Sequence, residues 1–159
     1  MGKTRVLRGE LLDFNYGGAV NVIQNDQRFN HGFIIKDFRI SYIDPADSNA
    51  GSRDCVGVLA THADAVVSKL SSSRIGFNWE DRRQVAWTST NHIGDSNIDF
   101  DAALIDPTHV VVRDLYVAIS AQAATGSTNW NYYIELEEVP LTDNQAVLAI
   151  VQEEAQDVN

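Results

Sequence analysis

Alternation of apolar and polar side chains with a period of two residues is the feature that most restricts how this chain can fold. It runs through three long segments, residues 32–43, 110–121 and 130–139. In the last of these, apolar side chains occupy every second position from Trp130 to Leu136, and polar ones lie between them. Successive side chains of a β-strand point to opposite faces. The three segments therefore predict long strands, and 130–139 should bury one face and expose the other.

The other two segments differ in how many faces they bury. In 32–43, the apolar face contains Ile34, Phe38 and Ile40 and is interrupted only by Lys36. This predicts a half-buried strand. Segment 110–121 is apolar on both faces, which predicts a central strand covered on both sides.

Short strand candidates and turn residues fill most of the remaining chain. The shorter candidates are residues 6–14, 19–23, 55–61, 75–79, 84–88 and 100–104. Glycine-, proline-, serine- and asparagine-rich stretches separate them, and the small, polar segment 122–129 joins two long strands as an antiparallel hairpin. About nine strands with such turns indicate an all-β fold, an antiparallel β-sandwich or barrel. We expect one domain over residues 1–159.

One helix is expected, at residues 142–156. Thr142 can serve as N-cap, with Gln145 at the capping-box position three residues later. Val147, Ile150 and Val151 then follow at helical spacing and form a narrow apolar stripe. Such a helix should dock either on its own sandwich or on a neighbouring subunit.

Charge is divided unevenly along the chain. The net charge is −10, and residues 101–159 contain ten acidic side chains but one basic residue, Arg113. This balance argues against a broad nucleic-acid surface, so any nucleic-acid contact should be minor. Residues 1–9 are expected to form a short basic arm that carries Lys3, Arg5 and Arg8. No stretch of about eighteen apolar residues predicts a transmembrane segment, and no signal sequence precedes the first strand.

An acidic segment is the one candidate metal site. Its possible calcium ligands are Asp95, Asn97, Asp99 and Asp101, followed by Asp106. Their spacing matches an EF-hand loop, but Phe100 occupies the position that requires glycine, and the flanking segments are predicted strands. The alternative is an acidic loop in water. No other cofactor is predicted.

Catalytic motifs are weak throughout the chain. Cys55 is the only cysteine and is expected to be a buried free thiol. Glu135 and Glu137 share one strand face, about 6 to 7 Å apart, as a glycosidase pair could. Exposed strand-face glutamates are much commoner than catalytic pairs, so the protein is not expected to be an enzyme.

Two tryptophans are candidates for stacking on sugar rings. Trp79 and Trp87 flank the polar connection 80–83, although a contact between the two rings would explain them equally well. A carbohydrate-binding β-sandwich, with or without the assistance of calcium, is therefore the alternative function.

A family resemblance comes from the last third of the chain. Residues 106–109 followed by Arg113-Asp114-Leu115-Tyr116, then 131–137 and a short closing helix, resemble small β-sandwich virion proteins of tailless or marine bacterial viruses. The resemblance implies a jelly-roll-like subunit that repeats in a shell, where other copies and other virion proteins are its partners. It also implies a location in the virion; otherwise a secreted or cytoplasmic soluble protein is expected.

The charge distribution favours assembly on separate grounds. A basic start and an acidic end allow head-to-tail contact between identical copies. The candidate contact residues are Lys3, Arg5, Arg8, Glu135 and Glu137. The alternative is that the acidic residues only keep the protein dispersed in solution.

Overall fold

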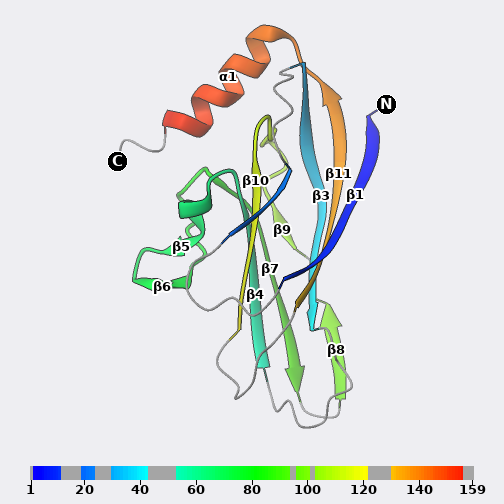
Figure 1. Ribbon diagram of the computed structural model, residues 1–159, viewed down its shortest axis with the longest axis vertical. Helices are drawn as coiled ribbons and strands as arrows, with labels where there is room; N and C mark the ends of the chain where they lie inside the picture. Colours follow the sequence, from blue (N-terminus) through cyan, green and yellow to red (C-terminus); the bar gives the residue numbers. More distant parts are fainter. Residues whose placement is uncertain are drawn as a thin grey trace.

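Two antiparallel β-sheets pack face to face in the computed structural model (Figure 1). It describes residues 2–11, 19–23, 30–42, 53–93, 96–100, 103–121 and 130–155. The smaller sheet has the order β1 (Lys3–Leu11), β11 (Trp130–Pro140), β3 (His31–Tyr42). The larger sheet has the order β2 (Val20–Ile23), β10 (Leu115–Ala121), β4 (Arg53–Ala60), β7 (Gln84–Ile93), β8 (Ser96–Phe100), and β9 (Leu104–Ile105) also pairs with β7.

The strands pair in a nested order. β1 pairs with β11, β2 with β10 and β4 with β7, all antiparallel. Within this nest, β3 meets the segment before β10 through a bridge between Phe33 and Val111. In a jelly roll, the first strand of the chain pairs with the last, the second strand pairs with the next to last, and the pairing continues inward in the same way. The predicted fold class, an all-β, jelly-roll-like antiparallel sandwich, is confirmed.

The main core lies between the two sheets. Strand β11 contributes Trp130, Ile134 and Leu136, each at most 2% exposed, while Asn131 on the alternate face is exposed. As predicted from the alternation in 130–139, β11 buries one face and exposes the other to solvent.

Strand β3 departs from the prediction because it contains a β-bulge. Asp37 pairs with Glu135 and Ile35 pairs with Leu136, so Lys36 is the extra residue between them. An extra residue moves all preceding side chains to the opposite face. Phe33 and Ile35 are consequently buried, and the predicted core position of Ile34 is wrong; that side chain is only half-buried.

A second, smaller core covers the outer face of the larger sheet. Residues 61–83 contain a 3₁₀ turn, η2 (Ala63–Val66), and the two-stranded hairpin β5 (Val67–Ser68) and β6 (Ser71–Ile75). Ala65 and Val66 from this segment pack with Val58, Ala60 and Ala118 of the sheet. β10 is thus covered on both sides, as its apolar composition predicted. The strand begins only at Leu115, and the predicted antiparallel hairpin with 130–139 is wrong, because β10 and β11 lie in different sheets.

The predicted helix is α1 (Asp143–Glu154), which lies at the end of the sandwich where β11 ends (Figure 1). Thr142 is its N-cap, and Thr142 and Gln145 form both reciprocal bonds of a capping box. Among the described residues, no helix has the length and apolar character needed to cross a membrane.

Candidate interface surfaces

The expected basic arm is a strand of the sheet. Residues Lys3–Leu11 pair in register along β11, so the described residues of the expected basic arm at 1–9 belong almost entirely to the smaller sheet. Arg5 Nη2 lies 2.8 Å from Glu138 Oε2, and the guanidinium lies 5.5 Å from the centre of the Phe33 ring. Ion pairs of the kind expected between copies therefore form in part within one molecule.

The predicted acidic contact residues, Glu135 and Glu137, lie on the outer face of the smaller sheet. Lys36 Nζ lies 2.6 Å from Glu137 Oε2. The hydrogen bond and positive charge of Lys36 lower the pKa of Glu137. The Tyr133 hydroxyl donates to Glu135 Oε2 at 3.4 Å. A glycosidase acid needs a raised pKa, so the ion pair with Lys36 disfavours that role for Glu137.

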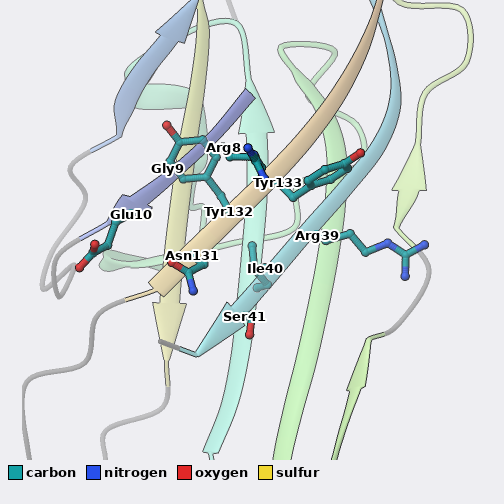
Figure 2. A pocket seen from close by; sticks show the side chains of 9 residues that line it. All are labelled: Arg8, Gly9, Glu10, Arg39, Ile40, Ser41, Asn131, Tyr132 and Tyr133. Carbon is teal, nitrogen blue, oxygen red and sulfur yellow. The ribbon is translucent and has the colours of Figure 1, made fainter. Parts of the chain in front are cut away.

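A shallow depression of about 580 Å³ lies on the smaller sheet, between Arg8 of β1, Tyr133 of β11 and Arg39 of β3. Figure 2 shows Glu10 extending toward the β1 side and Arg39 toward the β3 side. The Arg39 Nε already donates to both carboxylate oxygens of Asp37, at 3.1 and 3.0 Å. The depression is therefore lined by charged side chains of both signs as well as by apolar and tyrosine side chains.

Gly9 also lines this depression, and the ring of Tyr132 packs directly against Gly9. A Cβ at position 9 would be 2.4 Å from the Tyr132 hydroxyl oxygen. The ring can pack across β1 only where the neighbouring strand has no side chain, so glycine is required here by close approach.

Helix α1 is attached to the sandwich by a side that carries alanine and isoleucine side chains together with one buried carboxylate. Ala146 and Glu153 are each 1% exposed, whereas Val147, Leu148 and Val151 are 60%, 59% and 54% exposed. An ordinary surface helix buries its apolar stripe and exposes its charges. We call the surface of Val147, Leu148 and Val151 the helix face.

Two contacts between charged side chains hold the docked side of α1 in place. Glu153 Oε1 lies 3.5 Å from His109 Nε2, and both side chains are largely buried. The next residue, Glu154, forms an ion pair with Arg113, the only basic residue of the acidic third of the chain. These contacts orient the helix so that the helix face points to solvent.

Three further exposed apolar side chains lie in the β5–β6 hairpin and in the segment that follows it. Leu70, between the two strands, is 97% exposed, and Phe77 and Trp79, after β6, are 41% and 67% exposed; we call these three residues the hairpin patch. Trp79 meets Trp87 edge to face, with ring centroids 6.4 Å apart at 67°. The structure thus brings the two predicted tryptophans together and leaves Trp79 mostly exposed. The sequence interpretation did not single out Leu70, which follows no strand or helix period, or Phe77, which lies in the strand candidate 75–79.

The candidate calcium ligands fall largely outside the described residues. Asp95 and Asp101 lie there, and the side chains of Asn97 and Asp99 are not described. The backbone of 96–100 is strand β8, which differs from an EF-hand loop. Asp106 accepts hydrogen bonds from the backbone nitrogen and hydroxyl of Thr108, at 2.9 and 2.7 Å. Within the described ranges, no cluster of three or more histidine, cysteine or carboxylate side chains could hold a metal ion.

Cys55 lies in the main core and is 1% exposed. Burial raises the pKa of its thiol well above the ordinary value. The thiolate is the reactive form of cysteine, so this side chain is inert at neutral pH in the folded protein. The expectation of a buried free thiol is confirmed.

Comparison with known proteins adds no relative. No protein-family model matches the chain, and no curated protein sequence matches it. Function must therefore be inferred from the surfaces described above.

Proposed function

We propose that this protein is a self-assembling structural protein, a capsid or virion subunit that acts through contacts between copies. The helix face carries the proposal. Val147, Leu148 and Val151 are all more than half exposed, although the same helix buries Glu153. Burying an aliphatic side chain of this size contributes about 1.5 to 3 kcal/mol, so a partner that covered all three would be held by several kcal/mol.

The fold is compatible with this function. Jelly-roll sandwiches serve as capsid subunits and as lectin domains, and a fold alone does not determine function. The position of α1 at one end of the sandwich favours the capsid subunit, because the helix face is available there without any change in the core (Figure 1). Its apolar side chains suit a protein surface better than a sugar.

Light scattering coupled to gel filtration, together with electron microscopy, tests the proposal. We expect particle masses well above the 17.6 kDa of one chain, increasing with protein concentration. The substitution Leu148→Glu should shift the distribution toward single chains. A single 17.6 kDa species at every salt and protein concentration would contradict the proposal.

Trp79 supports carbohydrate binding as a second candidate. Its indole ring is 67% exposed and rests on Trp87, as a platform for a sugar ring would. Calorimetric titration with a panel of glycans, with and without calcium, should then give binding heat that Trp79→Ala abolishes. The absence of heat under both conditions would remove this candidate.

A further inference from the structure

We infer that the hairpin patch of one copy is the surface that receives the helix face of the next copy. This inference rests on the proposed function and names the two surfaces that would make the contact. Each is a small group of exposed apolar side chains on a part of the molecule that the sandwich core does not cover.

The centres of the two surfaces match in character. The helix face presents three aliphatic side chains, and the hairpin patch presents one aliphatic and two aromatic ones. Protein interfaces have apolar centres with polar rims, and tryptophan is among the residues that contribute most at such centres. Trp79 is the expected anchor on the hairpin side, because Trp87 already supports its ring.

The rims carry opposite charge. Helix α1 exposes the carboxylates of Asp143 and Glu154, buries Glu153 and contains no basic residue. Lys69 precedes Leu70 in the hairpin and is 61% exposed, and the exposed Arg82 follows Trp79 by three positions. Lys69 lies 3.9 Å from Glu80, a loose ion pair that an approaching carboxylate could replace. On the hairpin side, Lys69 and residues 80–83 together carry three basic and two acidic side chains, a net charge of +1. Contact of this segment with the acidic helix is therefore favourable, whereas two helix faces together would bring carboxylates close to each other.

The placement of the surfaces determines the kind of contact. α1 and the β5–β6 hairpin lie on the same side of β4 and β10 as separate elements (Figure 1). Because the two surfaces differ, each copy offers one helix face and one hairpin patch. Such heterologous contacts form closed rings or extended assemblies.

A mixing experiment tests the inference. In one variant Leu148→Glu removes the helix face, and in another Leu70→Glu removes the hairpin patch. Both sites are strongly exposed, so both variants should fold, which circular dichroism would verify. Each variant alone should need roughly tenfold or more higher concentration to assemble. An equimolar mixture retains one intact contact and should form a heterodimer that grows no further.

The outcomes separate the inference from the proposed function. If Leu70→Glu assembles at the wild-type concentration, or if the two folded variants form no heterodimer, the hairpin patch is not the receiving surface and the inference fails. If wild-type protein stays monomeric throughout, the proposed function fails. Val6→Lys is the control, because Val6 is 46% exposed on the other sheet and faces Glu135; this variant should assemble like wild type.

Discussion

Gln84 shows how one buried polar residue holds the hairpin patch in position. Its Nε2 donates to the carbonyl oxygens of Ala65 and Gly76, each at 2.8 Å. Its Oε1 accepts from the backbone nitrogen of Asn78 at 2.8 Å and from Trp87 Nε1 at 2.7 Å. All four hydrogen-bonding positions of the amide are used, so the side chain joins the covering segment 61–83 to strand β7.

Replacing the Gln84 amide should therefore destabilise the folded protein. Gln84→Leu leaves two carbonyl oxygens and two N–H groups without partners, and we expect the free energy of unfolding to fall by about 2 to 4 kcal/mol. Urea unfolding followed by tryptophan fluorescence measures this change. Gln152→Leu, on the exposed surface of α1, should change it little. Equal stability of Gln84→Leu and wild type would show that the amide network is not structural.

Asp81 gives the covering segment a dependence on pH. Partial burial raises the pKa of Asp81, but the hydrogen bonds and charge of Arg83 outweigh it, and the pKa lies below the ordinary value. Arg83 donates from its backbone nitrogen, Nε and Nη2, at 3.1, 3.0 and 2.9 Å. A carboxyl with a lowered pKa in the folded state stabilises the fold above its unfolded pKa.

The sign of the effect follows directly. Stability should fall as pH drops below the ordinary aspartate pKa of about 3.9 and on through the lower folded pKa of Asp81. Asp81→Asn removes the titrating group, so the urea midpoint of this variant should depend less on pH over that range. An identical acid dependence in both proteins would assign the effect to other carboxyls.

At the level of strands and helices, regular patterns were predictable and local irregularities were not. The alternation from Trp130 to Leu136 is uninterrupted, so the buried face of this strand could be read from the sequence. In β3 the bulge at Lys36 reverses the alternation partway, and only the pairing with β11 reveals it. The docking side of α1 was also beyond the sequence, because it depends on contacts of Glu153 and Glu154 with His109 and Arg113, more than forty positions away in the chain.

The N-cap of α1 is a separate point of control over the helix face. Thr142 Oγ1 accepts a hydrogen bond from the Gln145 backbone nitrogen, and Gln145 Oε1 accepts one from the Thr142 backbone nitrogen. Thr142→Ala should lower the free energy of unfolding by about 1 kcal/mol. It should also raise hydrogen exchange in the first turn of α1. Thr142→Ser keeps the capping oxygen and should behave like wild type; equal loss in both variants would contradict the capping role.

For the whole molecule, the structure changes the basis for expecting assembly. The sequence predicted contact between a basic start and an acidic end, yet β1 and β11 lie side by side in one sheet (Figure 1). Arg5 is already paired with Glu138. Charge asymmetry is thus partly satisfied within the subunit, and the exposed apolar surfaces become the main reason to expect contact between copies. Those surfaces were not predictable, because they arise where elements dock.

Cysteine cross-linking tests contact between the helix face and the hairpin patch most directly. One protein carries Leu148→Cys and another carries Leu70→Cys, while the buried Cys55 should not react in either. Under mild oxidation of the mixture, we predict a disulfide-linked dimer between the two different proteins, with far less linkage in either protein alone. Assembled particles that yield no such mixed dimer would contradict the account.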